Sequence, residues 1–236
     1  DQSYFLWDLT PEQLSAARFP VGALAKKEVR ELARSAGLPT ADKEESQEIC
    51  FVPRGDRAGD FVREHAPGMG LALPTLPGKI EGSSGQPLGE HSGHYRFTVG
   101  QRRGLGVAAP GRLYVLAVDA DANRVVVGAE GELLVGEARV EEMRFPSGAP
   151  DGPFHARVRV RHRGVETPAT VVPAAGGSGR VVFEEPVRAV APGQSCVFYD
   201  GDVVVGGGVI RGAERPPGAR RPRYSAVNLI GDRKDP

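Results

Sequence analysis

The sequence predicts an α+β fold that is mainly β, because helical patterns are confined to its first part. Before residue 53 the chain has a capped helix start and apolar residues at helical spacing. From residue 113 onward, short apolar and β-branched runs follow one another between turns. The 236 residues include 32 glycines and 20 prolines, which suit a protein with many turns.

Two helices are predicted near the N-terminus. Thr10 can cap the first helix, and Gln13 completes a capping box. The second helix is predicted over residues 26–36, where one apolar face recurs, and Gly37 is placed to end it. We expect residues 1–53 to be the C-terminal end of an α/β domain whose beginning lies outside this chain.

Residues 54–108 are predicted to form a small central α+β domain. It follows a proline- and glycine-bearing break in the helical pattern. We expect a short helix over residues 60–65 and strands over residues 79–81 and 95–99, with glycine- and serine-rich turns between them.

Residues 109–212 are predicted to form a β-barrel. Short strands at regular spacing, joined by turns that carry Asp, Gly or Pro, are typical of closed barrels. The expected strands cover residues 113–118, 124–128, 137–143, 154–162, 166–173, 180–183, 195–199 and 203–210. We expect the basic, proline-rich residues 213–236 to be disordered.

Composition limits the partners and the location that the chain can have. Its 30 basic and 30 acidic residues cancel, so a nucleic acid would have to be held by local patches. No apolar run approaches the roughly 18–20 residues of a membrane span, and no signal peptide is visible. Two widely separated cysteines do not make a disulfide framework. We expect a cytoplasmic, monomeric protein without membrane contact.

Cys50 is the first candidate for covalent chemistry. Its thiolate could act as a nucleophile or carry a persulfide. Alternatively it is a small buried hydrophobe, because it lies between Ile49 and Phe51, and the residue pattern alone favours burial. Cys196 lies inside an apolar strand, so burial is the stronger prediction there.

An alternating arginine run over residues 157–163 is the second candidate. At the two-residue period of a strand, its four arginines face one side and His162 faces the other with two valines. Such a row suits a phosphate backbone, or it is a charged edge strand that resists aggregation. The loop over residues 100–106 holds Arg102 and Arg103 in a glycine frame, and it either approaches phosphate or links two domains.

No metal site is predicted. His91 and His94 lie three positions apart, but no further ligand cluster is near them in the sequence. Neither common glycine-rich phosphate loop occurs in the chain.

Eight short motifs occur in a fixed order. They are DQSYFL at residues 1–6, FPVG at 19–22, GLPTA at 37–41, SQEICF at 46–51, GEHSG at 89–93, TVGQRRGLG at 98–106, PGQ at 192–194 and GGG at 206–208. The series resembles the bacterial tRNA-specific 2-thiouridylases, also called tRNA-uridine 2-sulfurtransferases, over residues 1–211. The resemblance implies the end of an ATP-pyrophosphatase domain, a small central domain and a barrel similar to those of translation elongation factors.

The resemblance also implies sulfur transfer to tRNA. In the family, ATP serves to adenylate the C2 oxygen of the wobble uridine, and the cysteine matching Cys50 carries a persulfide from a cysteine desulfurase or sulfur-relay protein. A second cysteine of the family forms a disulfide with that residue, and Cys196 does not correspond to it. The family's Ser-Gly-Gly-x-Asp-Ser loop for ATP is absent from these 236 residues. We therefore expect this chain alone to be inactive.

RNA contacts are carried over by the same resemblance. They fall on Asp1, Gln2, Arg161, His162 and Gln194, while Arg102 and Arg103 are added on charge and loop position. The competing hypothesis is a non-enzymatic RNA-binding module in which Cys50 is vestigial.

Overall fold

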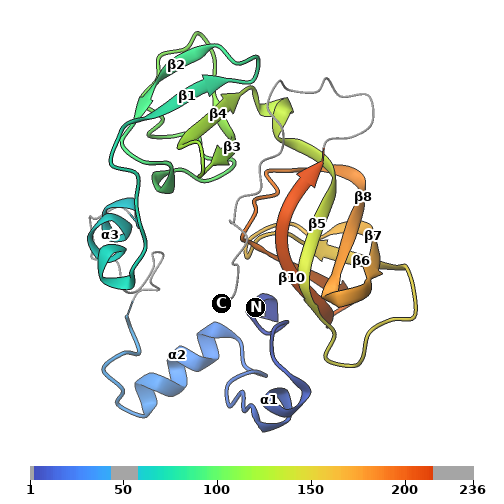
Figure 1. Ribbon diagram of the computed structural model, residues 1–236. Coiled ribbons are helices and arrows are strands. Elements are labelled where there is room, and N and C mark those ends of the chain that lie inside the picture. The colour runs from blue at the N-terminus through green and yellow to red at the C-terminus, as the bar shows by residue number, and fades with distance from the viewer. Residues whose placement is uncertain (1–2, 44–57, 215–236) are drawn as a thin grey trace.

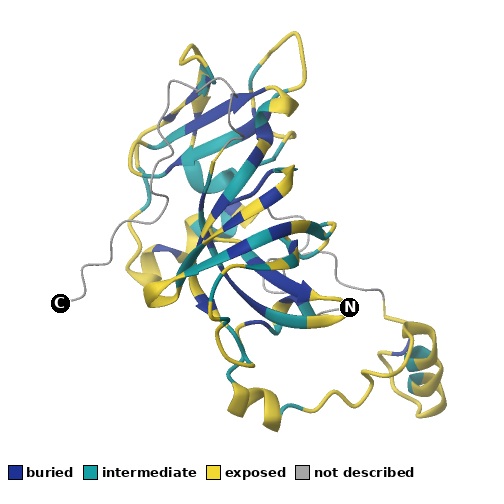
Figure 2. Cartoon of the chain, turned by 90° about the vertical axis from the view of Figure 1, so that its right-hand side faces the viewer, coloured by how far each residue is buried: buried dark blue, intermediate teal, exposed yellow. Residues whose placement is uncertain are grey.

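The computed structural model describes residues 3–43 and 58–214, and the fold is mainly β, as predicted. Figure 1 shows short helices near the N-terminus, a four-stranded sheet and a closed barrel. Figure 2 shows that buried residues concentrate in the strands, whereas the first helices are exposed. None of the helices in the described ranges is long and apolar enough to cross a membrane.

The N-terminal part contains a 3-10 helix and two α-helices: η1 (Ser3–Phe5), α1 (Pro11–Ala16) and α2 (Lys26–Ser35). The predicted capping box is present, because Thr10 Oγ1 accepts the Gln13 N–H at 3.2 Å and Gln13 Oε1 accepts the Thr10 N–H at 2.9 Å. Gly37 follows α2 with a φ of 68°, in the left-handed region that glycine adopts without strain. No residue of α1 or α2 is buried.

The central part joins one helix to a four-stranded sheet: α3 (Ala58–His65), β1 (Gly78–Gly82), β2 (Pro87–His91), β3 (Tyr114–Asp119) and β4 (Arg124–Gly128). The strand order is β2-β1-β4-β3, with β1 parallel to β4 and the other pairs antiparallel. The side chains of Ile80, Val115, Val125 and Val127 are fully buried and form its core.

The structure corrects the predicted position of two strands. The strands predicted over residues 113–118 and 124–128 are β3 and β4 of this sheet and do not belong to the barrel. The boundary predicted between residues 108 and 109 therefore separates strands of one sheet. The period-two pattern identifies a strand but does not identify the strand with which it pairs. β4 pairs in parallel with β1, and the two strands are separated in the sequence by most of the central domain.

The strand predicted over residues 95–99 is also wrong. The segment begins with η3 (His94–Arg96), and the Phe97 N–H donates to the His94 carbonyl at 3.0 Å. Arg96, the last residue of η3, donates to Asp60 on α3 at 2.7 Å, so this segment contacts a helix and pairs with no strand of the described sheet.

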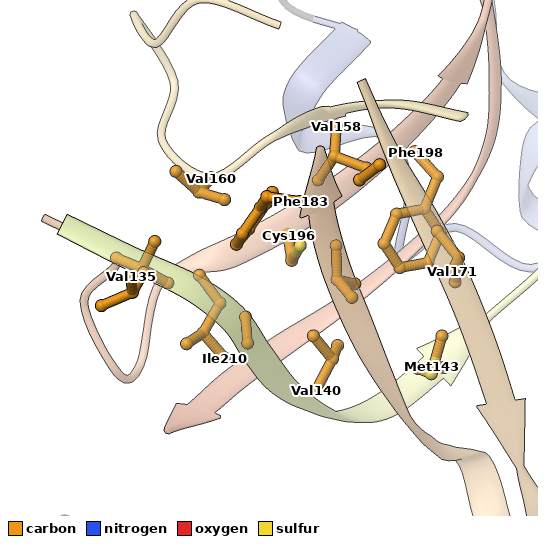
Figure 3. Close-up of a cluster of buried hydrophobic side chains, with 14 residues drawn as sticks. Val135, Val140, Met143, Val158, Val160, Val171, Phe183, Cys196, Phe198 and Ile210 are labelled. Atoms are coloured by element: carbon orange, nitrogen blue, oxygen red, sulfur yellow. The ribbon is translucent and has the colours of Figure 1, made fainter. Parts of the chain in front are cut away.

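Six strands close the barrel: β5 (Leu134–Arg144), β6 (Phe154–Arg159), β7 (Thr167–Ala174), β8 (Ser178–Arg188), β9 (Ser195–Asp200) and β10 (Val203–Glu214). Around the barrel the order is β10-β5-β8-β7-β6-β9. Figure 3 shows its apolar interior, where Cys196, Phe198 and Ile210 are completely buried. β10 runs through Glu214, so residues 213 and 214 are strand and not part of a disordered tail; residues 215–236 lie outside the described chain.

Candidate nucleic-acid interface

The N-terminal segment docks on the outside of the barrel. The Tyr4 hydroxyl donates to the Ser195 carbonyl at 2.8 Å, and Tyr4 and Trp7 are 3% and 6% exposed. Both rings pack with Val197 of β9. Arg144 at the end of β5 adds an ion pair to Asp8 at 2.9 Å. The residues that precede α1 are thus held against the barrel, although the barrel strands come much later in the sequence.

Gly207 explains how the Trp7 ring can lie so close to β10. A Cβ atom at position 207 would lie 2.7 Å from Trp7 Cγ. The neighbours of Gly207 are equally confined: a Cβ at Gly206 would meet the Arg144 carbonyl oxygen at 2.5 Å, and one at Gly208 would meet Val140 Cγ1 at 2.5 Å. The triple glycine is therefore required by close packing on both faces of β10.

Predicted RNA contacts gather around this docked segment. His162 lies in the turn after β6, and its ring centroid is 4.6 Å from that of Phe5 and 5.8 Å from that of Tyr4. Gln194 is exposed and immediately precedes Ser195, the acceptor of the Tyr4 hydroxyl. Asp1 and Gln2 lie outside the described residues but adjoin Ser3 in the chain. Predicted RNA contacts that are distant in the sequence, His162 and Gln194, thus lie next to the same docked N-terminal segment.

The predicted row of four arginines is shorter than expected. β6 ends at Arg159, and Arg161 lies exposed in the following turn. Arg157 and Arg159 both pair with Glu166, at 3.3 and 2.6 Å. Val158 and Val160 are buried, which confirms the alternation there, whereas His162, predicted on the same face, is only partly buried in the turn after β6. Because Glu166 neutralises part of the row, Arg161 is the member best placed to meet an outside anion.

Arg102 and Arg103 are placed elsewhere, in the loop between η3 and β3. They line an open cleft of about 670 Å³ together with Arg112 and Arg188. Arg188 comes from the end of β8, so the cleft lies where the central sheet meets the barrel. The sequence offered no indication of Arg112 or Arg188, because neither belongs to a recognisable pattern.

A second cavity, of about 520 Å³, brings together the motifs at residues 89–93 and 98–106 with Gly59 of α3. A Cβ at Gly59 would lie 2.7 Å from Arg96 Cγ, so glycine permits the close approach of α3. His91 lines this cavity and is 7% exposed; burial, reinforced by nearby His94, lowers its pKa. These contacts anchor the helix that follows the cysteine-bearing segment.

Only one of the two cysteines, Cys196, lies among the described residues. Cys50 lies outside the described residues, so its predicted chemistry stays a prediction. Cys196 is completely buried in the barrel core, as predicted, and burial raises the pKa of its thiol. A buried neutral thiol is a poor nucleophile.

Three family descriptions match the chain in succession. The tRNA methyl transferase HUP domain matches residues 1–54, the tRNA methyl transferase PRC-barrel domain matches residues 69–129, and the aminomethyltransferase beta-barrel domain matches residues 135–210. The second match contains all four strands of the central sheet, and the third lies within the closed barrel.

Curated relatives share one name. A tRNA-specific 2-thiouridylase of Acidobacterium capsulatum is 46% identical over 215 residues, which are 89% of this chain and 57% of that protein. Those of Nostoc punctiforme and Geobacter metallireducens are 42% and 45% identical, over 89% and 90% of this chain and 58% and 56% of theirs. The chain thus spans little more than half the length of these relatives.

Proposed function

Because this chain belongs to the family of tRNA-specific 2-thiouridylases, we propose that it supplies the RNA-binding and sulfur-carrying parts of an enzyme that thiolates the wobble uridine of tRNA. The observation that carries the proposal is the docking of η1 on the barrel. It places Tyr4 against His162 and against the carbonyl of Ser195, beside Gln194. Candidate RNA contacts from two barrel turns therefore border the segment that follows Asp1 and Gln2.

The sulfur step is assigned to Cys50. In this proposal its thiol receives a sulfur atom from a cysteine desulfurase or relay protein and becomes a persulfide. The second cysteine of the active enzyme attacks the Cys50 sulfur, the S–S bond of the persulfide breaks, and a disulfide forms while the outer sulfur leaves as hydrosulfide. The hydrosulfide then attacks C2 of the adenylated uridine, and the C2 oxygen departs with AMP. Cys196 is excluded from that second role because it is enclosed in the barrel core.

ATP would supply the activation that makes the uridine C2 oxygen a leaving group. The Ser-Gly-Gly-x-Asp-Ser motif does not occur in the 236 residues, so we assign no residue of this chain to ATP binding. The chain's own residues then have two tasks, to hold tRNA and to present sulfur. We propose that the protein performs both tasks in the cytoplasm.

Transfer of radiolabelled sulfur tests the proposal. Incubation with a cysteine desulfurase and ³⁵S-cysteine should label the chain in a bond that dithiothreitol breaks. Cys50→Ser should abolish the label, whereas the matched variant Cys196→Ala should keep it. The chain alone should form no 2-thiouridine from ATP, a persulfide donor and unmodified tRNA. A label that persists in Cys50→Ser would refute the assignment.

A non-enzymatic RNA-binding module is the second candidate. It is favoured by the placement of His162 and Gln194, which sit on the barrel and need no thiol. In that case tRNA binding would be the same in the wild type and in Cys50→Ser, and neither protein would accept sulfur. The labelling experiment therefore separates the two candidates.

A further inference from the structure

We propose that the cleft between the central sheet and the barrel binds phosphates of the RNA backbone through Arg102, Arg103, Arg112 and Arg188. This inference rests on the proposed function and extends it to a surface separate from the turn that contains His162. The four guanidinium groups come from the 100–106 loop, from the residues before β3 and from the end of β8.

The charge of the cleft is strongly one-sided although the whole chain is neutral. Among the described residues that line it, four are arginines and Glu130 alone is acidic. Glu130 pairs with Arg188 at 3.2 Å. Arg102, Arg103 and Arg112 are exposed and form no ion pair within residues 3–43 and 58–214. Three positive charges thus remain for a ligand, in an arrangement that costs electrostatic repulsion unless an anion is bound.

The walls of the cleft are held in place by packing. Tyr114, Leu133 and Ala189 are buried together, so the sheet, the connecting segment and the barrel share one apolar cluster. Arg188 lies over the Tyr114 ring at 4.9 Å, which fixes the direction of its guanidinium group. A charged group held in position loses less conformational entropy when it binds an anion.

The loop that carries Arg102 and Arg103 is also anchored. The Gly100 N–H donates to the Val115 carbonyl at 2.8 Å, and the Val115 N–H donates to the Gln101 carbonyl at 2.9 Å. The Gln101 side chain donates to the Arg103 carbonyl at 2.9 Å. Gly100 has a φ of 89°, and a Cβ there would lie 2.8 Å from that of Ala189. The glycine therefore lets the basic loop lie against the barrel.

The chemistry of the cleft favours a polyanion over a small phosphate compound. Arginine binds phosphate with two parallel donors and stays charged at all physiological pH values. The three unpaired arginines are exposed along an open cleft, which suits a backbone that passes through it with several phosphates. RNA is distinguished from DNA by its 2′-hydroxyl groups, and its sequence is read at the base edges. Arginines that contact only phosphates therefore contribute affinity and orientation, and no sequence specificity.

Fluorescence anisotropy with a labelled tRNA transcript, measured over a range of salt concentrations, tests the proposal on the full chain. The double variant Arg102→Gln/Arg112→Gln should lower the magnitude of the slope of log K against log salt by about 1.4–1.8, since each of the two lost phosphate contacts removes about 0.7–0.9. The control is Arg139→Gln/Arg180→Gln, two cross-strand neighbours on β5 and β8 that do not line the cleft. It should leave the slope unchanged, and thermal melting should show that both variants fold.

Each outcome has a distinct meaning. If the wild type binds tRNA and Arg161→Gln weakens binding while the cleft variant does not, the cleft is refuted and the proposed function stands. If the wild type binds no tRNA, both fail. Equal losses in the cleft variant and its control would show general charge attraction and overturn the site. Inorganic phosphate or ATP that binds with the same arginine dependence, while the slope for tRNA stays unchanged, would overturn the assignment to RNA.

Discussion

Tyr4 and Ser195, which lie 191 positions apart, are joined by a hydrogen bond of 2.8 Å from the tyrosine hydroxyl to the serine carbonyl. The bond fixes η1 against the turn that contains Gln194. Burial of the hydroxyl, reinforced by Cys196 nearby, raises the pKa of Tyr4 to about 12. The contact between the N-terminal segment and the barrel is therefore sensitive to alkaline pH.

Tyr4→Phe should remove this sensitivity. Below pH 10 the tyrosine is neutral in both the folded and the unfolded chain, so its full contribution to stability is present. Between pH 10 and about 12 the unfolded chain loses the proton first, and the free energy of unfolding falls as pH rises. At neutral pH the variant should lose about 0.5–1.5 kcal/mol with the hydrogen bond. Urea unfolding at pH 8 and pH 11 measures both effects, and an equal fall with pH in the variant would contradict the assignment.

Gly207→Ala should loosen the N-terminal segment from the barrel, because the new methyl group would lie 2.7 Å from Trp7 Cγ. Overpacking of this kind costs about 1–3 kcal/mol. Trp7 is the single tryptophan, so its fluorescence should shift to longer wavelength and become more accessible to acrylamide. The control is Gly212→Ala on the same strand, whose Cβ meets only the flexible end of Arg139. A red shift in the control alone would overturn this explanation of the glycine.

Local patterns predicted much of the fold. The capping box of α1 involves residues three positions apart, and the alternation at Val158 and Val160 reflects a strand with one buried face. The strand partners were harder to predict, because pairing depends on contacts between distant segments. For this reason the strand pattern alone predicts β3 and β4 as part of the barrel, although they belong to the central sheet.

The candidate site shows the same division. Arg161, His162 and Gln194 lie in motifs that a sequence displays, and the structure places the last two beside one docked segment. Arg112 and Arg188 are single arginines in unremarkable surroundings, and only the meeting of sheet and barrel brings them together. The ion pairs of Glu166 with Arg157 and Arg159 also cannot be predicted from the sequence, because they depend on where the side chains lie on either side of a turn.

Those ion pairs predict unequal roles for two arginines of the run. Arg161→Gln should weaken tRNA binding and lower the magnitude of the salt slope by about 1, because this side chain is exposed in the turn beside His162. Arg157→Gln should have a much smaller effect, since Glu166 already holds the Arg157 guanidinium at 3.3 Å. Anisotropy titrations at several salt concentrations compare the two variants. Equal losses would mean that the row acts as one surface despite Glu166.

Cys196 should be unreactive as long as the barrel is closed. In the variant Cys50→Ser it is the single thiol, so labelling reports on this residue alone. The side chain is completely buried, and burial also raises its pKa, so both access and thiolate formation are opposed. Its reaction with a disulfide reagent should be slower than in urea by a factor of about 10³ or more, because it requires opening of the core. Rapid labelling of the native protein would mean that the barrel opens readily, and it would restore Cys196 as a possible partner for the persulfide.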